Sequence, residues 1–202
     1  APLTNLRIET IKTSAGIIQG FIITDEAGIK YYFGQSKNAD RFGRELLKDA
    51  VTKTHKTPGG IYVGEPPFSI GAYMCFQSWM LMDIFFPTRS EMIQFSYFTE
   101  QNVETYVVTG QETAKGYVAG CPETSINYLH KKFDQPKLKE ITFPLGKVIF
   151  EKASNYRLDL DKSYALKRML LVDTKGTNND SIVKKMELHT SYMVSDTETL
   201  NV

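Results

Sequence analysis

The sequence is poor in the residues that form reactive or metal-binding sites. Its 202 residues include two cysteines, three histidines and one tryptophan. Cys75 and Cys121 are 46 positions apart, and neither belongs to a C-x-x-C pair or to a cysteine–histidine cluster. This spacing indicates two free thiols rather than a disulfide framework, and it supplies no ligand set for zinc. We therefore predict neither a metal centre nor a cofactor.

An excess of one charge is also missing, because 24 basic residues balance 23 acidic ones and leave a net charge of +1. That balance argues against an obligate binder of duplex DNA. The longest apolar run is shorter than the about 20 residues that a membrane helix needs, so we expect no membrane span. From the first residues we expect no signal peptide. These features predict a cytoplasmic protein or a component of a virion-like assembly.

Signatures of catalysis are absent as well. The glycines of "TPGGIYVGEPPFSIG" (57–71) match neither the G-x-x-x-x-G-K-[ST] nor the G-x-G-x-x-G phosphate-binding pattern, and there is no G-x-S-x-G. The sequence therefore favours a non-enzymatic protein.

Alternation of apolar and polar residues is the dominant pattern along the chain. In "NLRIETIK" (5–12) the apolar positions Leu6 and Ile8 alternate with Arg7 and Glu9, and similar runs recur to the end. Such runs, separated by turn residues, predict half-buried strands. We expect one mainly β domain over residues 1–202, an antiparallel sandwich or barrel of about nine to eleven strands.

Residues 38–53 depart from this alternation. Phe42, Leu46, Leu47 and Val51 recur at helical spacing, which predicts one main helix over this segment. A shorter helix-like piece is expected at "SINYLHKKF" (125–133).

The stretch "YMCFQSWMLMDIFF" (73–86) is the most apolar part of the chain. Its even positions are apolar except Ser78, which favours a strand over a helix buried on all sides. Fourteen extended residues span roughly 46 Å, so a bend or bulge is expected. The stretch is either a core strand or a core strand whose second face binds a partner or ligand. That second face holds Gln77, Trp79, Leu81, Asp83 and Phe85.

Asp83 needs a separate explanation, since it stands between Met82 and Ile84. It lies either at a solvent-exposed strand end or in the interior, where it would need an arginine, a hydroxyl group or backbone N–H donors.

Aromatic residues are abundant, with 12 phenylalanines and 11 tyrosines, and several tyrosines adjoin basic residues. Aromatic and basic side chains on an antiparallel sheet are typical of single-strand nucleic-acid binding. The candidate nucleic-acid-binding residues are Lys30, Tyr31, Tyr32, Tyr156 and Arg157.

Two short motifs, "HKT" at His55 and "HTS" at His189, resemble the paired H-x-T/S motifs of the two-histidine phosphoesterases. The resemblance covers six residues and implies one histidine acting as a base and the other as an acid. In that family the two motifs lie on adjacent strands.

The first hypothesis is a non-enzymatic structural or assembly subunit, which self-associates or docks on partners through its sheet. One alternative is a ligand-binding β-barrel for single-stranded nucleic acid or an aromatic small molecule. The other is the two-histidine phosphoesterase. Expected partners are further copies of the chain or a larger protein assembly, with nucleic acid as a second option.

Overall fold

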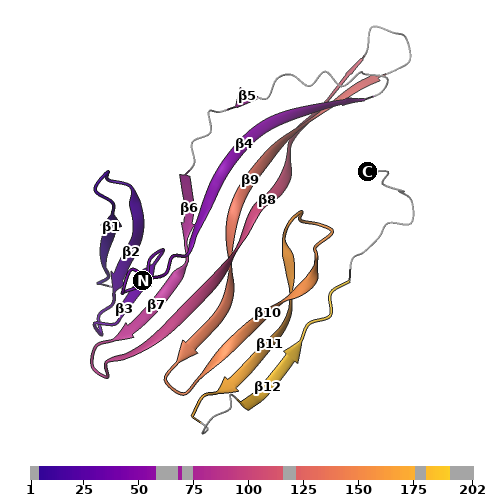
Figure 1. The fold of residues 1–202 in the computed structure, drawn as a ribbon. Helices are drawn as coiled ribbons and strands as arrows, with labels where there is room; N and C mark the ends of the chain where they lie inside the picture. Colours follow the sequence, from indigo (N-terminus) through magenta and orange to yellow (C-terminus); the bar gives the residue numbers. More distant parts are fainter. Residues whose placement is uncertain (1–4, 58–67, 70–74, 116–121, 176–180, 192–202) are drawn as a thin grey trace.

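The chain folds into one antiparallel sheet in the computed structural model, which describes residues 5–57, 68–69, 75–115, 122–175 and 181–191 (Figure 1). Nine strands follow one another across the sheet in the order β1-β2-β3-β7-β8-β9-β10-β11-β12. They are β1 (Arg7–Lys12), β2 (Ile18–Thr24), β3 (Lys30–Phe33), β7 (Leu81–Phe86), β8 (Glu91–Lys115), β9 (Pro122–Phe143), β10 (Gly146–Tyr156), β11 (Tyr164–Asp173) and β12 (Ser181–Glu187). The prediction of a mainly β, antiparallel fold is confirmed.

Three further strands lie beside this path. β4 (Arg44–Thr57) pairs with β9, and on its other edge with β5 (Phe68–Ser69) and β6 (Cys75–Trp79). The sheet is not closed, because β1 and β12 end the path and do not pair with each other. The expected architecture is a sandwich or a barrel; among the described residues the structure forms one open sheet, so it is not a closed barrel, and the sandwich is not confirmed. The prediction of a single domain over residues 1–202 stays a prediction.

The helix predicted over residues 38–53 is wrong for its larger part, since residues 44–57 form strand β4. The helix-like piece at 125–133 is wrong too, because it belongs to β9. The physical reason is pairing between distant segments. β4 has β9 along one edge and β5 and β6 along the other, so its backbone is bonded on both sides. Tertiary context of this kind overrides weak helical spacing.

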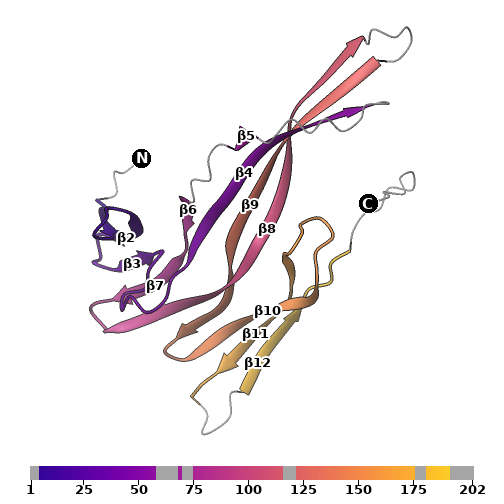
Figure 2. The same ribbon diagram turned by 45° about the horizontal axis from the view of Figure 1, so that its top comes forward.

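The long hairpin of β8 and β9 organises the sheet, and the two ribbons cross near the middle of their length (Figures 1 and 2). Register shifts at Ser96/Tyr97, Glu100/Val103 and Val108/Gly110 interrupt their pairing. Such bulges increase the right-handed twist of a strand pair. The twist changes the neighbour on the free edge of β9. Residues 140–143 pair with β10, whereas residues 124–134 pair with β4. We call the part of β9 between residues 134 and 140, where the neighbouring strand changes, the fork.

The apolar stretch that ends at Phe86 forms two strands joined at Met80, which confirms the extended prediction for its described residues, 75–86. Three backbone hydrogen bonds tie this joint to two glycines. Gly34 N–H donates to Met80 O (2.7 Å), Met80 N–H to Gly43 O (2.7 Å) and Gly43 N–H to Gly34 O (3.1 Å). The joint separates β6, which pairs with β4, from β7, which pairs with β3 and β8.

The core is small. Among the described residues, five apolar side chains are buried: Tyr32, Met82, Val103, Leu170 and Val172. In the same described part of the chain, fifteen large apolar side chains are exposed. No helix in the described part of the chain is long and apolar enough to cross a membrane.

Candidate functional site

Asp83 is fully buried, and its carboxylate anchors a loop to the sheet. Its Oδ1 accepts a hydrogen bond from Arg41 Nη2 (2.6 Å), and its Oδ2 accepts one from the backbone N–H of Lys37 (2.7 Å). Arg41 also donates from Nη1 to the carbonyl of Phe95 (2.9 Å). A buried Asp83 requires donors such as an arginine or a backbone N–H, and the structure supplies both. Asp83 therefore holds the loop in place.

The predicted partner face is only partly exposed. Gln77 is exposed, while Trp79, Leu81 and Phe85 are half-buried and Asp83 is buried. The indole of Trp79 packs edge-on against Phe21, with ring centroids 5.0 Å apart. The ammonium of Lys37 lies 3.6 Å from the ring centroid of Phe85.

The backbone carbonyl of Leu81 accepts a hydrogen bond from the hydroxyl of Tyr97 (2.7 Å). Burial raises the pKa of Tyr97 to about 12. These contacts place most of the predicted partner face against other parts of the chain.

The candidate nucleic-acid residues separate into two groups. Lys30, Tyr31 and Tyr32 lie on β3, with Lys30 exposed, Tyr31 half-buried and Tyr32 buried. Burial, and next the charge of Asp83, raise the pKa of Tyr32.

Tyr156 and Arg157 lie at the far end of the β10–β11 hairpin, and β7, β8 and β9 stand between β3 and β10. Arg157 binds both carboxylate oxygens of Asp159, at 2.9 and 2.5 Å. The structure therefore does not join the two groups into one surface.

A network of charged side chains joins β8 and β9 to the β10–β11 connection near the fork. Glu104 on β8 accepts hydrogen bonds from Lys162 Nζ (3.0 Å) and lies 3.0 Å from His130 Nε2. The ring of Tyr106 stacks on His130 at 4.5 Å. Lys162, and then His130, hold the pKa of Glu104 down at about 2. The side chains of Glu104 and His130 are 18% and 13% exposed, whereas that of Lys162 is 41% exposed, so the network reaches from a shielded pair to the surface.

Glu100 makes a second link between the same segments. Its side chain is buried and accepts the hydroxyl of Ser163 (2.6 Å) and the backbone N–H of Tyr164 (2.9 Å). On the other side of the hairpin, Lys48 of β4 pairs with Asp134 of β9 (2.8 Å). These contacts fix the strands at the fork, where β9 exchanges β10 for β4.

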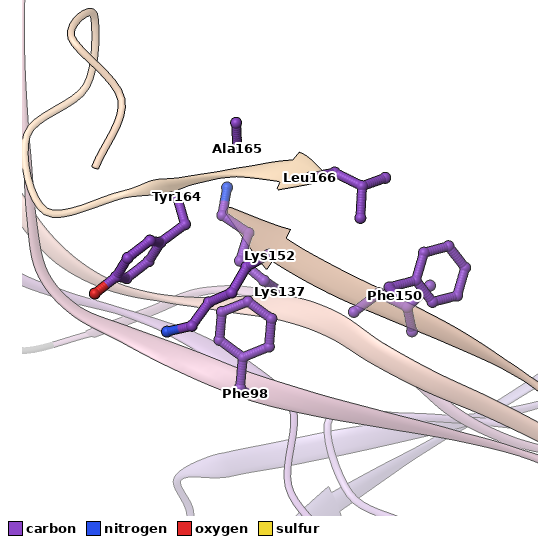
Figure 3. Close-up of a pocket in the computed structure, with 8 residues that line it drawn as sticks. Phe98, Lys137, Phe150, Lys152, Tyr164, Ala165 and Leu166 are labelled. Atoms are coloured by element: carbon purple, nitrogen blue, oxygen red, sulfur yellow. The ribbon is translucent and has the colours of Figure 1, made fainter. Parts of the chain in front are cut away.

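A cavity of about 290 Å³ opens beside the fork, between β8, β9, β10 and β11. It is lined by Phe98, Lys137, Leu138, Phe150, Lys152, Tyr164, Ala165 and Leu166. Figure 3 shows Phe98, Lys152 and Tyr164 close together on one side, with Phe150 and Leu166 on the other. The ammonium of Lys152 lies 3.7 Å from the ring centroid of Tyr164 and 5.2 Å from that of Phe98. Tyr156 packs on Tyr164 with centroids 4.6 Å apart.

This cavity combines apolar walls, aromatic rings and two lysines. It suits a small aromatic molecule with an anionic group, although its volume is at the lower end for ligand pockets. Sequence reasoning missed the cavity, because its lining comes from four strands and no segment carries more than three of the residues. The sequence-based candidate Tyr156 packs on the lining residue Tyr164 and does not itself line the cavity.

The two histidine motifs are not neighbours in the described sheet. His55 lies in β4, and His189 follows β12, which pairs with β11. His189 is exposed. Of the two thiols, Cys75 is free and exposed on β6, and Cys121 lies outside the described residues. Within the described part of the chain, no three His, Cys, Asp or Glu side chains gather in a way that could hold a metal ion.

Comparisons with protein-family models, with curated proteins and with solved structures found no match for this chain.

Proposed function

We propose that this chain is a non-enzymatic structural subunit that associates with further copies of itself through its sheet. The observation that carries the proposal is the number of large apolar side chains that are exposed. Fifteen large apolar side chains are exposed and five apolar side chains are buried among the described residues. Apolar surface on that scale in a soluble chain is typical of an interaction site.

The edges of the sheet support the same proposal. Among the described residues the strands that end the nine-strand path, β1 and β12, are each paired on one side only, and unpaired edges are templates for pairing with another chain. Association would reduce both the exposed apolar surface and the number of open edges.

The test is the molar mass in solution. Size-exclusion chromatography with light scattering, at loading concentrations from about 1 to 100 µM, should give a mass above 22.9 kDa that rises with concentration. A mass of one chain at every concentration would overturn the proposal.

A second candidate function, the binding of a small aromatic anion, rests on the cavity beside the fork. Its aromatic walls and Lys152 provide the apolar and cationic contacts that such a ligand needs. Calorimetric titration with 2-naphthoate tests it. Binding should be saturable and should be lost in Leu166→Trp, which fills the cavity. Binding that is unchanged in this variant would place the ligand elsewhere.

A further inference from the structure

The two strands that end the nine-strand path of the sheet have open edges with apolar side chains. β1 and β12 each pair with one strand, and no other strand in the described residues pairs with them. On β1, Ile8 is 62% exposed. On β12, Val183 and Met186 are 63% and 46% exposed. Both edges therefore present backbone donors and acceptors together with apolar side chains.

The same three-residue pattern stands on both edges: a basic, an apolar and an acidic residue. It is Arg7-Ile8-Glu9 on β1 and Lys185-Met186-Glu187 on β12. In each, the charged pair bridges across the apolar residue, at 2.6 Å on β1 and 2.5 Å on β12. Reversing the strand direction turns basic-apolar-acidic into acidic-apolar-basic. Each pattern is therefore complementary to itself in an antiparallel pair.

Hydrogen bonds fix which backbone groups of β1 point outward. Asp25 N–H donates to Ile29 O (3.1 Å), so the backbone of Asp25 faces β3 and that of Thr24 faces β1. Thr24 pairs with Arg7, so the backbone N–H and C=O of Arg7 face β2, and by alternation those of Glu9 do too. The N–H and C=O of Ile8 point away from the sheet.

The same reasoning gives the opposite phase on β12. Leu188 N–H donates to Lys167 O (2.8 Å), so the backbones of Leu188 and Met186 face β11. Those of Lys185 and Glu187 therefore point away from the sheet.

Two conditions select the partner edge: which residues point their backbone N–H and C=O outward, and which charges face each other. In an antiparallel pair, two residues opposite each other must both direct their backbone N–H and C=O towards the partner strand or both direct them away from it. A head-to-tail pair of β1 on β12 that matches the charges would set Ile8 opposite Met186. The backbone groups of Ile8 point outward and those of Met186 point towards β11, so the two residues cannot pair. A two-fold pair of β1 with β1, centred on Ile8, meets both conditions and sets Arg7 opposite Glu9.

β12 behaves in the same way. A two-fold pair centred on Met186 sets Lys185 opposite Glu187, whereas centres at Lys185 or Glu187 set like charges opposite each other. On β1, centres at Arg7 or Glu9 are excluded for the same reason.

We propose that a second copy of this chain pairs with each open edge about a two-fold axis, at Ile8 on β1 and at Met186 on β12. Alternation of the two contacts continues the sheet from copy to copy and gives an open polymer. This inference rests on the proposed function, because it names the surfaces and the register of the self-association.

Charge reversal tests the β1 contact. Arg7→Glu turns two attractive pairs into two repulsive ones and should weaken that contact by more than about tenfold. Since the β12 contact remains, sedimentation velocity should show dimers in place of polymers. The double variant Arg7→Glu/Glu9→Arg restores a self-complementary pattern and should restore the polymer. A head-to-tail contact would not recover in the double variant, and that result would overturn the proposal.

Lys185→Glu is the matching change on β12, and its combination with Arg7→Glu should give monomers. A wild-type chain that is monomeric would overturn the proposed function as well as this inference. A wild-type assembly that is insensitive to Arg7→Glu and Lys185→Glu would overturn this inference alone.

Disulfide trapping tests the register on β12. In a background with both native cysteines changed to serine, Met186→Cys should form a dimer on oxidation. Two residues at a non-hydrogen-bonded position are about 4.5 Å apart between Cα atoms, within the reach of a disulfide. Val183→Cys is the control, since it is exposed on the same strand and lies about 20 Å from its copy in this register. Equal cross-linking of both variants would exclude the register.

Discussion

Arg41 and Asp83 form an ion pair of 2.6 Å although they are 42 positions apart in the sequence. The carboxylate side chain is 1% exposed and the guanidinium side chain 27% exposed. The pair, with the Lys37 N–H, holds the loop between Gly34 and Gly43 against β7. This loop supplies the two glycines that bond the joint at Met80, so the pair supports the change of direction between β6 and β7.

Asp83→Ala should lower the free energy of unfolding by about 3–5 kcal/mol, since it leaves a partly buried arginine without its partner. Denaturant unfolding followed by Trp79 fluorescence measures the change. Asp40→Ala is the control in the same loop: Asp40 lies 3.7 Å from the same Arg41 and accepts the hydroxyl of Ser36, but its side chain is 60% exposed, and we expect the change to cost roughly 1 kcal/mol. Equal losses in the two variants would contradict a special role for the buried pair.

The sequence predicts the strand class well, because alternation is a local property and a strand needs only local alternation to be recognised. Residues 91–99 and 103–109 alternate as two runs, and the structure joins them into β8 across the bulge at Glu100/Val103. A bulge adds residues that interrupt the period, and so conceals the continuity of the strand.

The errors come from contacts between distant segments. β4 has apolar residues at helical spacing, but pairing on both edges decides its conformation. The sequence indicates that a buried Asp83 needs a donor but does not say which one, and the structure supplies Arg41 from a loop before β4. The cavity beside the fork depends on the twist of β8 and β9, which no local pattern encodes.

Acid should weaken the network at Glu104. Its pKa lies at about 2 in the folded chain and near 4.5 in the unfolded one, mainly because of Lys162. A lowered pKa gives stability that is complete above pH 4.5 and is lost as the pH falls towards 2. Glu104→Gln should therefore flatten the dependence of the unfolding free energy on pH in that range, by up to about one bound proton in the slope. Urea unfolding at a series of pH values measures the slope.

Glu91→Gln provides the control for that series, since Glu91 is exposed at the start of the same strand. A slope that is altered equally by both substitutions would show that net charge, and not the Glu104 network, causes the acid sensitivity.

Lys152 should contribute to any binding of aromatic anions in the cavity beside the fork. Lys152→Met keeps the aliphatic part of the side chain and removes the charge, so the affinity for 2-naphthoate should fall by about tenfold. Lys139→Met is the control, since Lys139 is exposed on β9 and does not line the cavity. Calorimetric titration measures both, and an equal loss in the two variants would indicate attraction by the general charge of the protein.

Gly34 is expected to tolerate no side chain, for a reason that separates it from Gly28. Both glycines have a φ of +77°, a conformation that costs other residues about 1 kcal/mol. A Cβ at Gly34 would lie 2.3 Å from Trp79 Cδ1 and 2.6 Å from Gln19 O, while one at Gly28 would meet only Pro87 Cγ, at 3.8 Å. Gly28→Ala should thus cost about 1 kcal/mol of unfolding free energy and Gly34→Ala roughly 3 kcal/mol. Only Gly34→Ala should also shift the emission of Trp79, because the indole must move from its contact with Phe21. If Gly34→Ala costs no more than Gly28→Ala and leaves the emission unchanged, the close packing of the joint against Trp79 is refuted.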